Sequence, residues 1–235
     1  AGPSKLGFLM EIAASAAVAA LERNTALILV PPIENPIEAL ETIAMDGALV
    51  VEPEENDPVL TLLNRVGVPT VCIGKPLGAK TAYIDLDYPV MADMLIEHLF
   101  DVGATRFPLI VGASTRPSNL AFKEAYRAAC ERAGMAEVII EVAEYLAESG
   151  AAEAVAGLMD DGYVFDAVLA PTDAMATGVM QALRRAKRAV PLEVRVVTRY
   201  DGFRARTEAP PLTALNLKLD VVAALATRKL AEIIQ

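Results

Sequence analysis

Short apolar runs alternate with longer amphipathic stretches along most of the chain. Fully buried parallel strands read as continuous apolar runs, whereas the helices that connect them carry an apolar stripe. The alternation therefore predicts repeated β–α units and an α/β fold with parallel sheets. The predicted strands are Ala26–Val30, Gly47–Val51, Thr70–Ile73, Ala82–Ile84, Phe107–Val111, Val138–Glu141, Ala167–Ala170, Val194–Thr198 and Thr213–Asn216.

Helical patterns occupy the intervals between these runs. Several of them begin with Pro or Ser, residues that are favoured at the start of a helix. The predicted helices are Met10–Arg23, Pro36–Ala44, Pro58–Val66, Pro89–Val102, Ser118–Ala133, Ser149–Asp160, Ala174–Arg188 and Leu219–Ile234.

Polar clusters follow two successive predicted strands. Thr172 and Asp173 come after Ala167–Ala170, and Arg199, Tyr200 and Asp201 come after Val194–Thr198. In an open parallel sheet, ligands bind in the crevice beyond the carboxyl ends of the strands. These clusters predict a small-molecule site.

Four sequence patterns carry a family resemblance. They are Met45–Val50, Asp85–Asp87 with Glu97-His98-Leu99 in the next helix, Ala170–Asp173 with Ala176 and Gly178 behind it, and Pro210–Thr213. In this order and over nearly all of the chain, they resemble the effector-binding core of the LacI/GalR family of bacterial transcription regulators. The resemblance implies a periplasmic-binding-protein type I fold, with two Rossmann-like lobes facing each other across a cleft.

The resemblance also implies a division of the chain. Residues 1–104 are expected to form the first lobe and residues 105–217 the second, with residues 218–235 returning to the first lobe. Asp101–Thr105 fits the first crossover. Ser4–Phe8 resembles the family's first strand, but the helix from Met10 follows at once, so roughly ten residues of the usual connecting loop are expected to be missing. The chain also stops at Gln235, short of the family's closing strand.

Residues of both polar clusters are candidates for contact with the ligand. Asp201 matches an acidic residue that accepts hydrogen bonds from ligand hydroxyls, and its alternative role is a capped turn before Gly202. Arg199 is suited to bidentate contact with a carboxylate or phosphate; the alternative is an ion pair with Asp201. Thr172, where many relatives carry Asn, is expected to face the ligand, and Asp173 is expected mainly to cap the following helix.

Further candidates lie near the starts of two other helices. Ser118 matches a family serine, but the family's ligand-gripping arginine four residues later is Phe122 here. Because an apolar ring replaces five hydrogen-bond donors, a sugar or acid held in the usual way is less expected. Arg116 is a second candidate source of charge. Asp87 and Tyr88 match the family's Asp-Asn pair, and Asp85 with Asp87 is interpreted as a solvated turn rather than a metal site.

Charge argues against DNA binding by this chain alone. It has 235 residues, a net charge of −10 and 54% hydrophobic residues. Phosphate contact needs clustered Lys and Arg, and the only dense basic run, Arg184–Arg188, fits the end of a helix. The family places DNA binding in a separate helix-turn-helix head, which nothing here matches.

Other classes of function find little support. No apolar run approaches the roughly 18 residues that cross a bilayer, and no export leader opens the chain. Cys72 and Cys130 are expected to be buried free thiols in a reducing compartment. The one histidine, His98, lies inside a predicted helix, and no Gly-rich nucleotide motif or nucleophile with its base is present, so neither catalysis nor a metal or cofactor is expected.

These observations predict the effector-binding core of a cytoplasmic, homodimeric transcription regulator that takes a sugar, nucleoside or related metabolite between its lobes. Operator DNA would be bound only through the absent head. The alternatives are a periplasmic-type solute (sugar) binding protein of an uptake system and a hydrolase on a related sheet.

Overall fold

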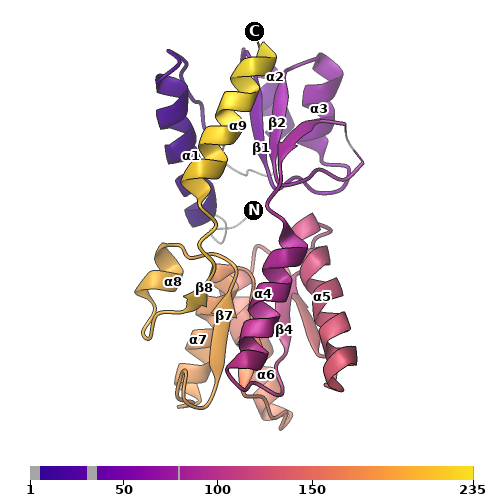
Figure 1. The fold of residues 1–235 in the computed structure, drawn as a ribbon, viewed down its shortest axis with the longest axis vertical. Coiled ribbons are helices and arrows are strands. Elements are labelled where there is room, and N and C mark those ends of the chain that lie inside the picture. Colours follow the sequence, from indigo (N-terminus) through magenta and orange to yellow (C-terminus); the bar gives the residue numbers. More distant parts are fainter. Residues whose placement is uncertain (1–5, 31–35, 79, 235) are drawn as a thin grey trace.

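Two lobes stacked along the long axis of the molecule make up the structure (Figure 1). This computed structural model describes residues 6–30, 36–78 and 80–234. Each lobe contains a parallel sheet with helices packed against it. The predicted α/β class with two parallel-sheet lobes is therefore confirmed.

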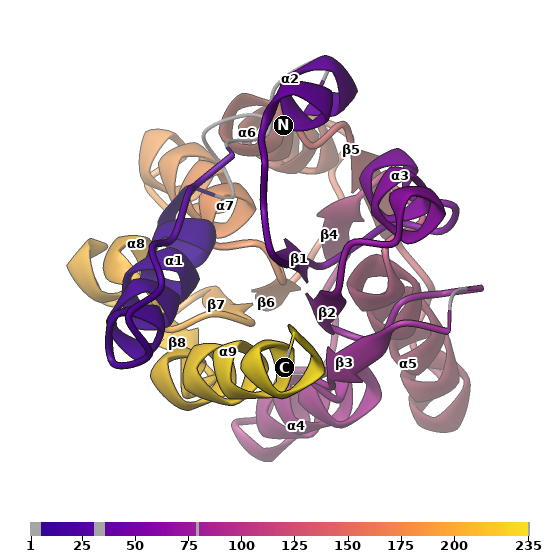
Figure 2. The ribbon, with the colours of Figure 1, turned by 90° about the horizontal axis from the view of Figure 1, so that it is seen from above.

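The first lobe is built on a sheet of order β1-β2-β3, formed by Ala48–Val51, Thr70–Ile73 and Ala82–Ile84. The helices α1 (Leu6–Leu21) and α9 (Leu219–Ile234) run side by side along it, while α2 (Pro36–Thr42) and α3 (Pro58–Val66) lie at the other side (Figures 1 and 2). The last helix thus returns to the first lobe. Apolar residues from α1, β2 and α9 share one core: Phe8, Ile12, Val71, Ile73 and Ala223.

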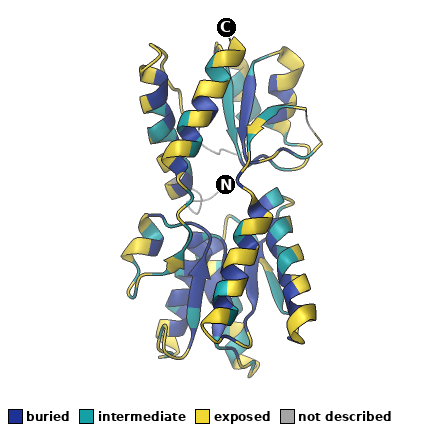
Figure 3. Cartoon of the chain, viewed as in Figure 1, coloured by how far each residue is buried: buried dark blue, intermediate teal, exposed yellow. Residues whose placement is uncertain are grey.

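The second lobe contains a sheet of order β5-β4-β6-β7-β8. Its strands are β4 (Leu109–Gly112), β5 (Ile139–Val142), β6 (Ala167–Leu169), β7 (Arg195–Thr198) and β8 (Thr213–Ala214). The sheet separates two cores, one under α4 (Tyr88–Asp101) and α5 (Pro117–Ala133), the other under α6 (Ala147–Asp160) and α7 (Asp173–Arg185). The inner strands β4 and β6 are fully buried, whereas the edge strands β5 and β8 are partly exposed, as are the outer helix faces (Figure 3).

Local signals explain where several elements begin and end. Asp57 precedes α3, and its Oδ1 accepts hydrogen bonds from the backbone nitrogens of Val59 (2.9 Å) and Leu60 (3.1 Å). This cap satisfies donors that have no partner within the helix. The same helix ends at Gly67, whose φ of 75° is the left-handed conformation that glycine adopts without strain. The predicted bounds of α3 and α9 agree with the structure.

The chain crosses between the lobes earlier than the sequence predicted. Residues 88–104 were assigned to the first lobe, but α4 packs against α5, β6 and β7 of the second. Asp101–Thr105 is therefore the end of α4 and the turn after it, and the crossing precedes Tyr88. The physical reason is the apolar face of α4, where Ala92, Leu95 and Leu99 are buried against the second lobe's sheet.

Two predicted strands of the first lobe are wrong. Leu6–Phe8 form the start of α1, while Ser4 and Lys5 lie outside the described residues. Ala26–Val30 has no regular structure and is largely exposed, with Ile28 63% accessible. A strand requires a neighbour to pair its backbone groups, and no described strand lies beside this apolar run.

The sequence missed one short helix but correctly predicted the state of both cysteines. The short helix α8 (Phe203–Thr207) follows β7 within a stretch predicted to be a loop. Cys72 on β2 and Cys130 on α5 are buried free thiols, as predicted. Among the described residues, no helix is both long and apolar enough to span a membrane.

Candidate functional site

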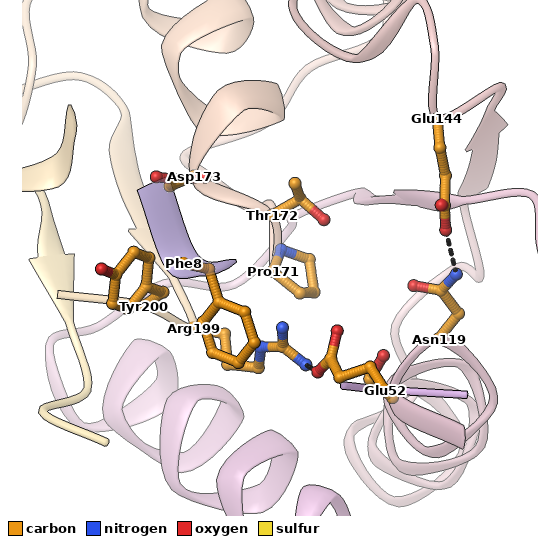
Figure 4. Close-up of a pocket in the computed structure, with 10 residues that line it drawn as sticks. Phe8, Glu52, Asn119, Glu144, Pro171, Thr172, Asp173, Arg199 and Tyr200 are labelled. Atoms are coloured by element: carbon orange, nitrogen blue, oxygen red, sulfur yellow. Dashed lines mark hydrogen bonds and ion pairs between the residues drawn. The ribbon is translucent and has the colours of Figure 1, made fainter. Parts of the chain in front are cut away.

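A cavity lies between the two lobes at the carboxyl ends of their strands (Figure 4). The first lobe contributes Phe8 from α1 and Glu52, which follows β1 directly. The second contributes residues at the start of α5, after β5, between β6 and α7, and after β7. Its lining residues there are Ser118, Asn119, Glu144, Pro171, Thr172, Asp173, Arg199 and Tyr200. This is the edge where ligands bind in open parallel sheets.

Arg199 crosses from the second lobe to the first. Its Nη1 donates a hydrogen bond of 2.7 Å to Oε1 of Glu52, and the same oxygen accepts a hydrogen bond of 3.0 Å from the hydroxyl of Tyr88. Arg199 and Glu52 are both buried, at 8% and 5% exposed. Burial, and then the neighbouring Glu52 carboxylate, raise the pKa of Tyr88 well above its ordinary value, so Tyr88 is the hydrogen-bond donor.

A second polar group surrounds Glu144, which follows β5. Its Oε1 accepts hydrogen bonds from Asn119 Nδ2 (3.2 Å) and Ser114 Oγ (2.6 Å), and its Oε2 lies 3.3 Å from Nε of Arg116. Arg116 also reaches the first lobe, where its Nη2 is 2.6 Å from Oε1 of Glu54. The Glu144 carboxylate thus joins α5, β5 and the rim of the cleft.

Thr172 and Asp173 lie where β6 turns into α7. Asp173 is 5% exposed, and its Oδ1 accepts a hydrogen bond of 2.8 Å from the backbone nitrogen of Ala174. Burial raises the pKa of this carboxyl, against hydrogen bonding by Ala174 and the charges of Arg204 and Arg199, which act in the other direction. The expected N-cap is displaced by one residue: Thr172 is the capping position, without a side-chain cap, and Asp173 is the first residue of the helix.

The predicted site residues divide into three groups. Four line the cavity: Ser118, Thr172, Asp173 and Arg199. Tyr88 and Arg116 lie just behind it and hold Glu52 and Glu144. Asp201, Phe122 and Asp87 are outside its lining.

Each of these last three has another structural setting. Asp201 accepts hydrogen bonds from Nε (3.1 Å) and Nη2 (3.2 Å) of Arg206, and Arg199 pairs with Glu52, so the alternative pairing predicted for Arg199 is wrong. Phe122 is fully buried in the core beneath α5. Asp87 is exposed and precedes α4, where its Oδ1 accepts from Val90, and Asp85 accepts from the backbone of Asp87 as a turn does. The described residues hold no group of three potential metal-binding side chains.

Sequence reasoning missed Glu52, Glu144 and Asn119. Glu52 and Glu144 stand at or just beyond the ends of predicted strands, so the rule that selected Thr172 and Arg199 would have found them. Asn119 adjoins Ser118 in a first helical turn. Phe8 could not be found, because it was expected in a strand rather than in α1.

Side chains fill most of the space between the lobes. The free volume of the cavity is about 20 Å³, which is room for about one water molecule. Sites for small molecules typically enclose about 300–1,000 Å³. A metabolite therefore needs the lobes to separate or the lining side chains to move.

Residues 96–235 match the family model described as a periplasmic binding protein-like domain. The chain belongs to this family. The match begins within α4 and includes all strands of the second lobe and the helix that returns to the first. The relatives and solved structures described next confirm the resemblance to LacI/GalR regulators.

Two relatives are regulators of transcription. The HTH-type transcriptional regulator CelR of Thermobifida fusca is 31% identical over 177 residues, which cover 73% of this chain and 52% of CelR. The ribose operon repressor of Escherichia coli (strain K12) is 31% identical over 193 residues, which cover 81% of this chain and 58% of the repressor. The chain thus spans about half the length of these curated relatives.

Solved structures agree with the fold. The transcriptional regulator CelR–cellobiose complex superposes with a TM-score of 0.84 at 26% identity, covering 97% of this chain and 72% of that one. A putative LacI-family regulator from Sanguibacter keddieii gives a TM-score of 0.82, also at 26% identity, with 97% and 85% coverage. These similarities extend the relationship to the first-lobe residues before 96, which the family model does not cover.

Proposed function

We propose that this chain is the effector-binding core of a LacI-type transcription regulator and that it binds a small molecule between its lobes. The observation that carries the proposal is the cavity itself, where side chains from both lobes meet at the carboxyl ends of parallel strands. Its lining mixes carboxylates, an amide, a guanidinium and aromatic rings. Such a mixture provides orientation as well as contact area for a ligand.

The mechanism we propose is a population shift between two lobe arrangements. A ligand that contacts both lobes favours the arrangement in which both sets of contacts form, by as much as its affinity differs between the two. In the proposed full-length regulator, the first lobe passes this difference to a helix-turn-helix head outside this chain. The head, and not this acidic chain, would bind operator DNA in the cytoplasm.

A sugar is the ligand class that we propose for the cavity. Carboxylate oxygens such as those of Glu144 and Asp173 accept hydrogen bonds from hydroxyls, and the ring of Phe8 offers an apolar face. The sequence argument against a sugar rested on Phe122, whose side chain lies in the core. Support also comes from the similar structure of CelR in complex with cellobiose and from the relative named the ribose operon repressor.

Homodimerisation is part of the proposal. A dimer would present paired heads to paired half-sites on DNA. Sedimentation analysis of the purified chain across a concentration series tests this, since a dimer doubles the mass at high concentration and a monomer keeps it constant.

A thermal-shift screen of the purified chain over mono- and disaccharides, nucleosides and organic acids tests the ligand. A ligand that binds only the folded state raises the melting temperature by mass action. We expect a sugar to do so and Asn119→Ala, which removes a lining amide, to weaken its binding about tenfold. Arg132→Ala is the control, because Arg132 is exposed and pairs with Glu97 far from the cavity. Shifts by acids alone, or equal shifts in both variants, would contradict the proposal.

A further inference from the structure

The side chain of Arg199 enters a socket that belongs to the first lobe. Two rings flank its guanidinium, with the central carbon 5.5 Å from the ring centre of Phe8 and 5.4 Å from that of Tyr88. Glu52 closes the socket with its carboxylate oxygen 2.7 Å from Nη1. Figure 4 shows the guanidinium reaching past the Phe8 ring toward Glu52. Phe8 belongs to the first lobe, and Tyr88, the first residue of α4 just after the crossing, packs its ring into the first-lobe core.

This socket suits a guanidinium. Aromatic faces attract cations electrostatically, and they also stack on the planar guanidinium, which is less strongly hydrated than an ammonium. The carboxylate supplies a charge-assisted hydrogen bond in a buried setting, where the interaction is least screened by salt. A lysine has neither the plane nor the fork, so the socket discriminates between the two cations.

Contacts from both sides of the crossing shape the socket around Glu52. Glu52 has a φ of 48°, a conformation that a residue with a side chain adopts only when its surroundings hold it there. The hydroxyl of Tyr88 donates to the same carboxylate oxygen that receives Arg199, which fixes its direction. Arg116 donates to the backbone oxygen of Glu52 as well.

The neighbouring Tyr200 adds a second insertion. Its ring packs edge-on against Phe8 at 5.4 Å and lies in the first-lobe core, while its hydroxyl donates to Glu11 on α1. Two consecutive residues at the end of β7 therefore anchor the second lobe in the first. The ion pair of Arg199 with Glu52 has both side chains deeply buried, whereas in the pair of Arg116 with Glu54, which also joins the lobes, the side chain of Glu54 is 39% exposed.

We propose that Arg199 is an internal ligand, whose guanidinium occupies a cation socket of the first lobe and latches the two lobes together across the cavity. The inference rests on the proposed function in one respect: a latch matters because a metabolite has to enter between the lobes. Among the described residues, Nε of Arg199 has no hydrogen-bond partner. The guanidinium is thus incompletely satisfied, and a ligand with an acceptor at this nitrogen gains a contact that the latch itself lacks.

Small-angle X-ray scattering of the ligand-free chain tests the latch directly. We expect Arg199→Ala and Glu52→Gln to have a larger radius of gyration than the parent chain, since the lobes are no longer held together. Arg206→Ala is the matched control, because it removes an arginine that pairs with Asp201 inside the second lobe. Unchanged radii in both latch variants would overturn the proposal.

Chemical rescue tests the socket in Arg199→Ala. Methylguanidinium at millimolar concentration is expected to raise the melting temperature of this variant by about 2–4 °C, the shift that a few-fold excess over Kd gives in a chain of this size. It should also return the radius of gyration to that of the parent chain. Methylammonium is the matched cation and should do neither. Equal effects of the two cations, or no rescue, would contradict a guanidinium socket.

The latch can still be tested by scattering if Arg199→Ala folds poorly. Glu52→Gln keeps the volume of the side chain and changes only its charge, so its scattering decides the matter if Arg199→Ala cannot be purified. For any ligand found by the thermal-shift screen, the latch also predicts tighter apparent binding to Glu52→Gln than to the parent chain. Scattering and rescue need no effector, so they can fail or succeed independently of the proposed function.

Discussion

Two aspartates at opposite ends of β6 have pKa values shifted in opposite directions by their surroundings. Asp173 is almost fully buried and receives one backbone hydrogen bond, so burial raises its pKa. Asp166 receives three hydrogen bonds from Thr105 and two further contacts at its carboxylate from nearby backbone, including Arg106. Burial would raise the pKa of Asp166 too, but these hydrogen bonds outweigh it and lower the pKa. The two aspartates therefore affect stability with opposite signs.

We expect Asp173→Asn to raise the melting temperature at pH 7 by about 2–4 °C, the effect of about 1 kcal/mol in a chain of this size. Because the folded-state pKa of Asp173 is raised, the charged form costs stability above that pKa. The gain from Asn should therefore shrink as the pH falls through the folded-state pKa toward the ordinary value of 3.8. Calorimetry from pH 7 to pH 4 measures the trend.

Asp166→Asn is the control with the opposite sign. A lowered folded-state pKa contributes stability above the ordinary value of 3.8, and this contribution is lost as the pH falls through the folded-state pKa. We expect a lower melting temperature at pH 7 and a difference that narrows in acid. Equal responses of the two variants to pH would contradict opposite shifts in the pKa values of Asp173 and Asp166.

The thiol of Cys72 provides a separate test at the residue scale. Burial on β2, and then the charge of Asp57, raise its pKa from 9.0 to about 12. Because only the thiolate reacts rapidly with iodoacetamide, we expect the folded chain at pH 8 to be modified at Cys72 far more slowly than the same chain in urea. Mass spectrometry of peptides after timed quenching distinguishes Cys72 from Cys130. Comparable rates in the two conditions would show that β2 opens readily.

At the scale of elements, α6 and α7 are packed almost backbone to backbone. A Cβ added at Gly178 would lie 2.0 Å from the carbonyl oxygen of Glu148 and 3.1 Å from the nitrogen of Ala152. Because the added methyl group would clash with the backbone of α6, the two helices would have to move apart. Gly178→Ala should therefore lower the free energy of unfolding by about 2–4 kcal/mol. Urea denaturation followed by circular dichroism measures the loss.

The matched control is Gly157→Ala on α6. A Cβ at Gly157 meets nothing within 4 Å, and alanine is the better helix former by about 1 kcal/mol. This variant should be equally or more stable than the parent chain. If Gly178→Ala were tolerated as well, the close approach of the two helices would be wrong.

For the whole molecule, the net charge disfavours DNA binding by this chain. The chain carries a net charge of −10, and its densest basic run ends α7, where Arg184 pairs with Glu208. Phosphate contacts supply most non-specific affinity for DNA. We expect no retardation of a DNA duplex by this chain in a gel shift at low salt, at micromolar protein. Retardation that fades with added salt would reveal a phosphate-binding surface.

Much of the fold was predictable because it depends on local pattern. The bounds of α3 and α9 and the positions of β2 and β3 follow from apolar runs, caps and helix breakers, which act within a few residues. Ala26–Val30 was misassigned for the opposite reason: an apolar run becomes a strand only beside a partner. The crossing before Tyr88 likewise depends on which sheet covers the apolar face of α4.

The sequence by itself determined the α/β class, the family resemblance and half of the cavity's polar residues, because polar residues after apolar strands gather at one edge of a parallel sheet. Only the tertiary structure decided their partners. Glu52 and Arg199 are 147 residues apart along the chain, and their contact depends on how two separately folded lobes meet. Spacing within either lobe carries no information about that contact, so the alternative partner that the sequence offered for Arg199 was the nearby Asp201 and not the distant Glu52.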